Sequence, residues 1–221
     1  MKNFIMKYKH AWVFSYMLLY FVWFFALEQR GGVPMTVIHT PFDNLIPFNE
    51  FFYIPYVLWF LYIPAVVLYF FFTSKKDFFK ICIFLFTGMT ICLIIYTLWP
   101  NCQNLRPLTF ERDNFFVDCV QRLYGFDTST NVCPSIHVFN SIGAHIAIRS
   151  SEKLKNKKWL RFGSFVLASL ICLSTVFLKQ HSIIDGLCAV SLACVLYFFV
   201  YYLNYSAMKE RRQARKDIAF H

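Results

Sequence analysis

The sequence has few charged residues. Asp, Glu, Lys and Arg make up only 15% of its 221 residues, whereas 58% of the residues are hydrophobic. A soluble domain of this size cannot hide so large an apolar fraction inside one core. The scarcity of charge therefore excludes an ordinary soluble protein, and we expect lipid to surround most of the molecular surface.

Several other features are absent. There is no internal repeat, low-complexity tract or soluble domain, so we expect a single membrane domain over residues 1–221. No small-residue cleavage site follows the first apolar stretch, which predicts a retained helix and not a signal peptide. No Cys-x-x-Cys or other metal-ligand spacing occurs, so the sequence predicts neither a metal site nor a cofactor.

The chain does contain six long apolar stretches. A helix needs roughly 20 mostly apolar residues to cross the hydrocarbon layer of a membrane. We therefore expect an all-α fold, a bundle of six transmembrane helices, at about Ala11 to Ala26, Phe51 to Thr73, Ile81 to Trp99, Val132 to Ile148, Phe162 to Leu178 and Ser182 to Asn204.

The basic residues gather between these stretches and at the chain ends. Most of the 22 Lys and Arg lie in four segments that share one side of the membrane if the helices alternate: 2–9, 75–80, 149–161 and 209–216. Short cytoplasmic loops carry the excess of Lys and Arg, so both termini are predicted to be cytoplasmic. Topology thus explains the net charge of +10. A nucleic-acid partner is not expected, because the basic residues form no single face with aromatic or motif support. We expect the basic tail, residues 209–216, to lie beside anionic membrane lipids instead.

Ionisable side chains from three distant segments converge on the opposite, outer side. Arg106 lies in the loop from Pro100 to Thr130, and His137 begins the fourth predicted helix. Lys179, His181 and Asp185 lie in the turn that leads into the sixth. Each residue alone has an ordinary explanation as an interfacial side chain. Their convergence predicts a functional site at the outer membrane face.

The spacing within this group indicates chemistry. His181 and Asp185 are four residues apart at a helix start, so their side chains share one face. A carboxylate that accepts the proton of one imidazole nitrogen fixes the tautomer and leaves the other nitrogen as a base or nucleophile. We expect this pair to do chemistry and not only to pack.

The start of the fourth helix favours an anion. We expect Thr130 or Asn131 to cap it and Pro134 to occupy its first turn, with free backbone amides and Ser135 facing the same point. Arg106 adds a planar fork of donors that suits two phosphate oxygens. Together with the histidines and Lys179, these groups predict a site for a phosphoryl group.

Three short motifs resemble those of the type 2 phosphatidic acid phosphatase superfamily. They are "NLRP" at 104–107, "CPSIH" at 133–137 and "STVFLKQHSIID" at 174–185. The family patterns are Lys-x6-Arg-Pro, Pro-Ser-Gly-His and Ser-Arg-x5-His-x3-Asp. The resemblance places the catalytic core at about residues 100–186. It implies that His181 attacks phosphorus, Asp185 orients it, His137 protonates the leaving group, and Arg106, Ser135 and Ser174 bind phosphate oxygens.

The match departs from the family pattern at three positions. Trp99 occupies the position of the lysine in the first family motif, and Ile136 occupies that of the glycine in the second. Thr175 occupies the position of the arginine in the third motif. We expect Lys179 to replace one of the two missing cations. The bulky Ile136 and the missing lysine also resemble the branch that contains inositol-phosphorylceramide synthases.

The sequence leaves three functions open. The leading one is a metal-independent lipid phosphatase that hydrolyses a lipid phosphate or diphosphate at the outer face of the cell membrane through a phosphohistidine. The second is a lipid head-group phosphotransferase, and the third is a non-enzymatic transporter or scaffold. The lipid itself is not specified: phosphatidate, polyprenyl diphosphate, phosphatidylglycerol phosphate and sphingolipid-like phosphates all fit, and the oligomeric state is not specified either.

Two further features, a group of three cysteines and one segment, each have alternative interpretations. Cys102, Cys119 and Cys133 lie on the outer side, where one disulfide could form. The segment from His39 to Glu50 either lies over the site or only anchors the second helix.

Overall fold

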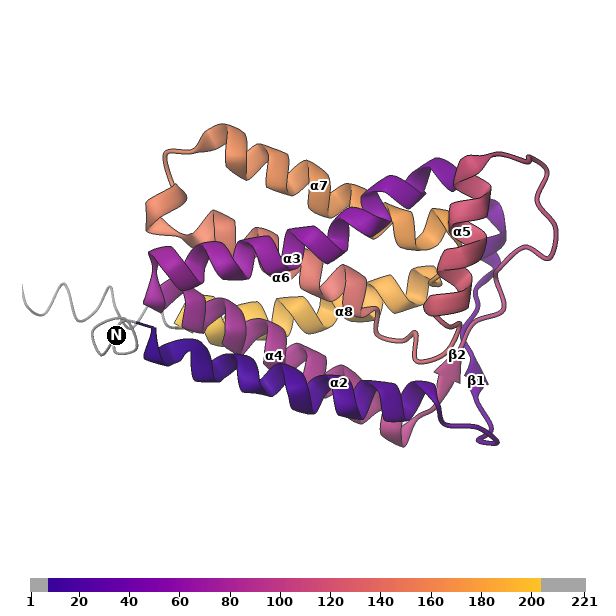
Figure 1. Cartoon of the computed structure of the whole chain (residues 1–221), viewed down its shortest axis with the longest axis horizontal. Coiled ribbons are helices and arrows are strands. Elements are labelled where there is room, and N and C mark those ends of the chain that lie inside the picture. Colours follow the sequence, from indigo (N-terminus) through magenta and orange to yellow (C-terminus); the bar gives the residue numbers. More distant parts are fainter. Residues whose placement is uncertain (1–7, 204–221) are drawn as a thin grey trace, which may run out of the picture.

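The computed structural model describes residues 8–203 as a bundle of helices that run roughly along one axis (Figure 1). The helices are α2 (Ser15–Glu28), α3 (Tyr53–Thr73), α4 (Lys75–Leu98), α5 (Phe115–Phe126), α6 (Ile136–Ser150), α7 (Lys158–Phe177) and α8 (Ile183–Tyr197). Short 3-10 helices are η1 (Lys9–Phe14), η2 (Pro41–Leu45), η3 (Glu50–Phe52) and η4 (Glu152–Leu154), and α8 continues as a π-helical turn, η5 (Phe198–Tyr202). Two strands, β1 (Thr36–Val37) and β2 (Asn101–Cys102), form a parallel pair.

The predicted all-α membrane fold is confirmed in its main features. Within residues 8–203, five helical segments are long and apolar enough to cross a membrane: Lys9–Glu28, Glu50–Thr73, Lys75–Leu98, Lys158–Phe177 and Ile183–Tyr202. The fourth predicted stretch instead forms α6, which has only 15 residues and begins four residues later than expected. A sixth complete span therefore stays a prediction.

α6 is the central helix of the bundle. It packs against α3, α4, α7 and α8, and most of its side chains are buried. Glycines allow its close approach to α4: a Cβ atom on Gly88 would lie 2.0 Å from Cζ of Phe139, and one on Gly143 would lie 2.6 Å from Cε1 of Phe84. The rings of Phe84 and Phe139 stack at 5.0 Å between these two glycines. The position of α6 is thus fixed by tight packing on α4.

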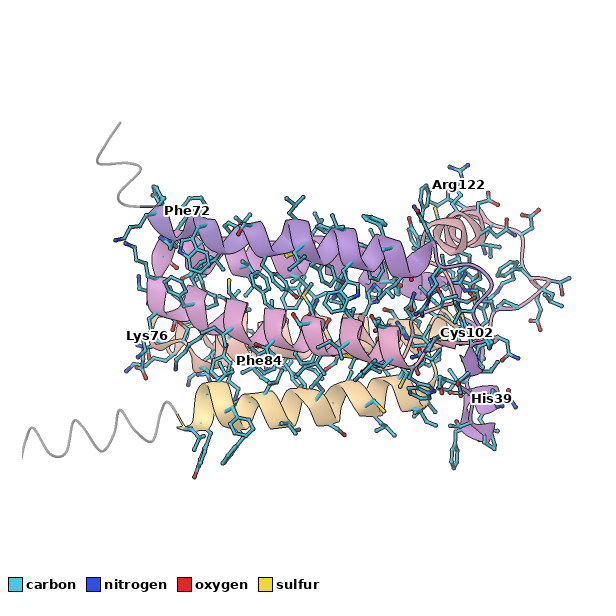
Figure 2. The ribbon with its side chains drawn as sticks, turned by 90° about the horizontal axis from the view of Figure 1, so that it is seen from below. His39, Phe72, Lys76, Phe84, Cys102 and Arg122 are labelled. Carbon is cyan, nitrogen blue, oxygen red and sulfur yellow. The ribbon has the colours of Figure 1, made fainter. Side chains whose placement is uncertain are left out.

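The two ends of the bundle differ in composition. The α3–α4 junction and the α6–α7 connection lie at one end, with Phe72 and Lys76 (Figures 1 and 2). The strand pair, α5 and the α7–α8 turn lie at the other end, with His39, Cys102 and Arg122. The basic segments 75–80 and 149–161 therefore share one end, as the sign pattern predicts. Lys2, Lys7 and the basic tail lie outside the described residues, and the cytoplasmic orientation of the termini stays a prediction.

α5 is a helix that the sequence analysis missed. The side chain of Asn114 accepts hydrogen bonds from the amides of Phe116 and Val117 and caps the helix. The apolar side chains of Val117, Val120 and Leu123 repeat every three residues and are buried. α5 packs across the end of α3 and forms one wall beside the site.

Candidate active site

The turn between α7 and α8 holds the predicted His181 and Asp185 together. Ser182 caps α8, and its amide donates to Oδ2 of Asp185 at 2.9 Å. The same carboxylate oxygen lies 3.3 Å from Nδ1 of His181. Asp185 is completely buried. The predicted contact is therefore present, and it leaves Nε2 of His181 as the ring nitrogen without a carboxylate partner.

His137 lies opposite this pair. The amide of Ser135 donates to the main-chain carbonyl of Asp185 at 3.1 Å, which joins the start of α6 to the start of α8. The rings of His137 and His181 are 5.8 Å apart. Nε2 of His137 is buried and has no hydrogen-bond partner within the described part of the chain. The ring of His137 is flanked by the aromatic rings of Tyr56 and Trp59, whose centroids lie 4.7 and 4.4 Å from its own.

The loop before α6 is held by Asn101. Its Oδ1 accepts hydrogen bonds from the backbone amides of Val132 and Cys133, both at 2.8 Å. Its Nδ2 donates a hydrogen bond to the carbonyl of Cys133. Residues 132 and 133 are thereby kept out of the helix. Ser135 is the N-cap, and its hydroxyl accepts from the amide of Val138. The predicted cap at Thr130 or Asn131 and the predicted place of Pro134 inside the first turn are therefore wrong.

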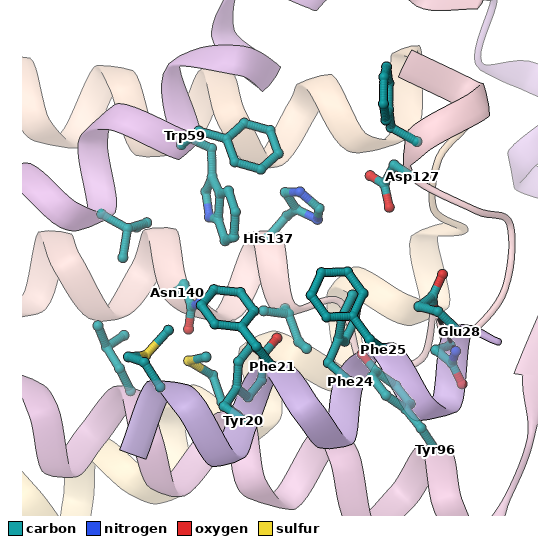
Figure 3. A pocket seen from close by; sticks show the side chains of 18 of the residues that line it. Tyr20, Phe21, Phe24, Phe25, Glu28, Trp59, Tyr96, Asp127, His137 and Asn140 are labelled. Carbon is teal, nitrogen blue, oxygen red and sulfur yellow. Dashed lines mark hydrogen bonds between the residues drawn. The ribbon is translucent and has the colours of Figure 1, made fainter. Parts of the chain in front are cut away.

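A cavity of about 820 Å³ opens beside the two histidines. Figure 3 shows its polar end, where Asp127 lies near His137 and Glu28 lies farther from it at the end of α2. The apolar body of the cavity is lined by aromatic and aliphatic side chains of α2, α3 and α4. His137, Gln180 and His181 line the polar end. Pockets that bind small molecules have volumes of roughly 300 to 1,000 Å³, so the cavity has the size of a ligand site.

Of the side chains predicted for the site, only His137 and His181 line this cavity in the described structure, with Asp185 directly behind His181. The hydroxyl of Ser174 is buried and donates to the carbonyl of Ile171 at 2.6 Å. The hydroxyl of Ser135 is engaged at the cap of α6. Their role as phosphate ligands stays a prediction.

Arg106 lies behind the cavity wall. Its guanidinium donates to the carbonyls of Tyr124 and Asp127 and to Oε1 of Gln180, and it stacks over the ring of Tyr124 at 4.3 Å. Burial lowers the pKa of Arg106, and the carboxylate of Asp127 opposes that shift. In the described structure Arg106 does not line the cavity itself, and it contacts two residues that do, Asp127 and Gln180. Nε2 of Gln180 has no hydrogen-bond partner there.

Lys179 is engaged by the segment from His39 to Glu50. Its Nζ donates to the carbonyls of Asp43 and Ile46, and its φ of 54° places the backbone in the left-handed region. Burial lowers the pKa of Lys179, and Asp43 opposes the shift. The expectation that Lys179 replaces a missing phosphate-binding cation stays a prediction, and the structure gives the side chain a different partner.

Asp43 fixes the same segment to the start of α8. Its carboxylate accepts from the hydroxyl of Ser182 at 2.7 Å and from the amide of Ile183 at 2.9 Å. Burial raises the pKa of Asp43, but hydrogen bonds from Ile183, Ser182 and Thr40 outweigh burial and leave the pKa below its ordinary value. Of the two alternatives for the segment from His39 to Glu50, the structure shows the first, because the segment lies over the α7–α8 turn that holds His181.

Sequence reasoning missed four polar residues of this region: Asp43, Asp127, Asn140 and Gln180. Gln180 directly precedes His181, and that adjacency was an available signal. The roles of the others depend on contacts between distant segments. Cys102, Cys119 and Cys133 are free thiols, so the disulfide that could have formed among them is not present.

Fold and site together define a helical membrane protein with a histidine pair beside a cavity, and one member of the pair is backed by a buried carboxylate. A family model for the PAP2 superfamily matches residues 101–209, and this part of the chain is a PAP2-superfamily domain. The match confirms the resemblance that the motifs indicated, and proteins of this superfamily are generally phosphatases or related phosphoesterases. The similarity to the inositol-phosphorylceramide synthase branch stays a prediction. Comparisons with curated proteins and with solved structures gave no match.

Proposed function

We propose that this protein is a membrane enzyme that transfers the phosphoryl group of a lipid phosphate ester to water through a phosphohistidine on His181. The observation that carries the proposal is the pair of histidine rings 5.8 Å apart, one backed by Asp185, at the polar end of a cavity that is otherwise apolar. Phosphate chemistry and lipid binding thus meet in one place.

The first step forms the covalent intermediate. Nε2 of His181 attacks phosphorus, the bond from phosphorus to the lipid oxygen breaks, and protonated His137 gives its proton to that oxygen. Asp185 accepts the Nδ1 proton of His181 in a hydrogen bond and stabilises the positive charge that develops on the ring. The lipid alcohol then leaves toward the apolar part of the cavity.

The second step restores the enzyme. His137, now neutral, accepts a proton from water, whose oxygen attacks phosphorus while the bond to Nε2 of His181 breaks. Inorganic phosphate is the product when the donor is a monoester. The proton that His137 gave in the first step is recovered in the second, so the cycle balances.

Gln180 is the group best placed to contact the phosphoryl oxygens. Arg106 donates a hydrogen bond to Oε1 of Gln180, so the NH₂ group of Gln180 points away from Arg106. This NH₂ group, Nε2, has no hydrogen-bond partner among residues 8–203. Preorganised donors of this kind stabilise the charge that develops during phosphoryl transfer. We propose that Arg106 acts on the phosphate through Gln180.

The cavity gives lipid a route from the bilayer. α2 packs mainly on α4, while α3 packs on α4, α6 and α7, and both α2 and α3 contribute to the cavity wall. Phe21, Phe25 and Phe60 line the cavity and are also 46%, 56% and 49% exposed. The cavity therefore reaches the surface that faces lipid. We propose that the site lies at the outer face of the cell membrane, because the basic loops lie at the opposite end of the bundle.

A head-group phosphotransferase is the second candidate. In the described structure no Lys or Arg lines the cavity, and its wall is mostly aromatic and aliphatic. Such a wall also suits a lipid alcohol as the acceptor of the phosphoryl group. In this reaction the alcohol replaces water in the second step, and His137 accepts its proton.

The experiment uses purified full-length protein, a panel of lipid monophosphates and phosphodiesters, and water enriched in oxygen-18. We expect the heavy isotope in released phosphate, at a rate unchanged by EDTA. Unlabelled phosphoryl head group on diacylglycerol or ceramide, with no label in free phosphate, would identify the transferase. No reaction with any donor, together with flux of lipid across vesicles, would establish the transporter in place of either enzyme.

A further inference from the structure

Asn140 is a buried amide inside the apolar part of the cavity. Its side chain lines the cavity, and the residue is only 2% exposed. Its Oδ1 has no hydrogen-bond partner in the part of the chain that the structure describes. An unpaired buried acceptor costs free energy, and buried polar groups in proteins are normally paired. Asn140 is therefore positioned for a polar group that the ligand supplies.

The position of Asn140 along α6 indicates which part of a bound lipid would contact its side chain. It follows His137 by three residues, so it lies on the same face of the helix about 4.5 Å deeper along the axis. Figure 3 shows Asn140 on the side of His137 away from Asp127, beside the aromatic side chains of α2. A lipid whose phosphorus lies between the two histidines would have its first backbone carbons at this depth.

Lipid classes differ at that depth. A glycerol or sphingoid backbone carries an ester carbonyl, a hydroxyl or an amide there, only a few covalent bonds from phosphorus. A polyprenyl phosphate carries only hydrocarbon. A half turn of the Asn140 amide exchanges its oxygen and its NH₂ group, so it can accept from a hydroxyl or amide and donate to an ester carbonyl.

We propose that Asn140 is a specificity-determining residue that binds the polar backbone of a glycerol or sphingoid lipid phosphate and so discriminates against polyprenyl phosphates. This inference rests on the proposed function, because it takes the histidine pair as the place of phosphorus. Specificity arises at a buried polar group, since a ligand without a matching group leaves the amide unpaired.

The test compares two monoesters that share a head group: dioleoyl phosphatidate and a polyprenyl monophosphate. Purified wild-type protein, Asn140→Leu and Ser141→Ala are each assayed for kcat/KM with both lipids. Ser141 is the matched control, because it is a neighbouring buried polar residue whose hydroxyl is already paired with the carbonyl of His137 at 2.7 Å. The readout is the ratio of the two values, which general damage to the fold does not change.

We expect the wild type to prefer phosphatidate. Asn140→Leu should lower kcat/KM for phosphatidate about tenfold, the effect of one ordinary hydrogen bond, and leave kcat/KM for the polyprenyl lipid unchanged or raised, because no amide is then left unpaired. Ser141→Ala should keep the wild-type ratio. An equal loss with both lipids in Asn140→Leu, or a wild type without preference, would overturn the proposal.

A binding measurement separates this inference from the proposed function. His181→Ala protein, which cannot form the intermediate, is titrated with each lipid in competition with a fluorescent lipid phosphate. Tighter binding of phosphatidate that is lost in His181→Ala/Asn140→Leu supports the role of Asn140 even if the wild type turns over neither lipid, a result that would refute only the phosphatase. Equal binding of both lipids would refute the role of Asn140.

Discussion

At the scale of single residues, the proposed reactivity of His181 depends on one buried carboxylate. Oδ2 of Asp185 is shared between Nδ1 of His181 and the amide of Ser182, and the residue is completely shielded from solvent. The carboxylate thereby both orients the imidazole and terminates α8. Because these two tasks use one oxygen, an NH₂ group in its place would change the tautomer of His181 and would also weaken the cap of α8.

Asp185→Asn tests both tasks of this carboxylate. The amide has nearly the same shape, but its NH₂ group cannot accept the Nδ1 proton, so His181 is held in the wrong tautomer. We expect kcat to fall by about three to four orders of magnitude with little change in KM, by analogy with other carboxylate–histidine pairs. Steady-state kinetics with the best lipid donor, together with thermal unfolding, measure this.

Asp118→Asn provides the control. Asp118 lies exposed on α5, and its substitution should leave kcat unchanged. If Asp185→Asn kept wild-type kcat in a folded protein, Asp185 would be only a helix cap.

The proximity of His137, His181 and Asp185 could be predicted from the sequence because their motifs are local. His181 and Asp185 are one helical turn apart, and His137 follows the Pro-Ser pair directly. For Gln180 the sequence offered only its adjacency to His181. The proposed role of Asn140 could not be predicted, because it depends on a cavity to whose wall the distant helices α2 and α3 contribute. Arg106 was assigned from its residue type and from the NLRP motif, and Lys179 from its residue type. In the structure both donate to carbonyls of segments whose conformation the sequence did not predict.

At the scale of secondary-structure elements, the close contact of α4 and α6 determines where His137 lies. Gly88 faces the ring of Phe139, three of whose carbon atoms would lie within 2.7 Å of an added Cβ. Such a distance is far below van der Waals contact, and the fully buried ring of Phe139 has little room to move. The glycine is therefore required for the observed packing.

Gly88→Ala should destabilise the bundle. Overpacking of a tight interior contact typically costs about 1 to 3 kcal/mol, and here it should also displace α6 and reduce turnover. Thermal unfolding in detergent measures the first effect and kcat the second. Gly163→Ala, on α7, is the matched control, because its added Cβ meets nothing within 4 Å and should leave the unfolding temperature unchanged or slightly raised. Equal stability of the two variants would contradict the packing account.

Element boundaries were predictable where a cap is local and unpredictable where a distant residue decides. The sequence of α5 contains its own signals, the Asn114 cap and the three-residue repeat of Val117, Val120 and Leu123. The late start of α6 follows instead from Asn101, which binds two backbone amides some 30 residues away. Apolar length alone therefore overestimated the fourth helix.

At the scale of the whole molecule, the two ends of the bundle should face different compartments. The exposed residues Asn104 and Leu108 lie in the loop at the site end, whereas exposed Lys75 and Lys157 begin or precede helices at the basic end. Ser135 and Ser182 also lie at the site end but are fully buried, so they are poor targets for labelling. The sign of the loops predicts that the site end faces outward.

Single-cysteine labelling in intact cells measures this orientation. The eight native cysteines are first replaced, and one cysteine is then introduced at Asn104, Leu108, Lys75 or Lys157. A membrane-impermeant thiol reagent should reach the first two positions in intact cells and the last two only after permeabilisation. The reverse pattern would place the site on the cytoplasmic face.

The most direct measurement of the central claim is the capture of the covalent intermediate. Protein is mixed for milliseconds with a lipid phosphate that carries phosphorus-32 in its phosphoryl group, and the reaction is stopped in alkaline denaturant, in which phosphohistidine is stable. The label is then assigned to a peptide by mass spectrometry. We predict phosphohistidine at His181 in the wild type and no labelled peptide in His181→Ala. Rapid turnover with no label on the protein, or label at His137 with His181→Ala still active, would contradict the account.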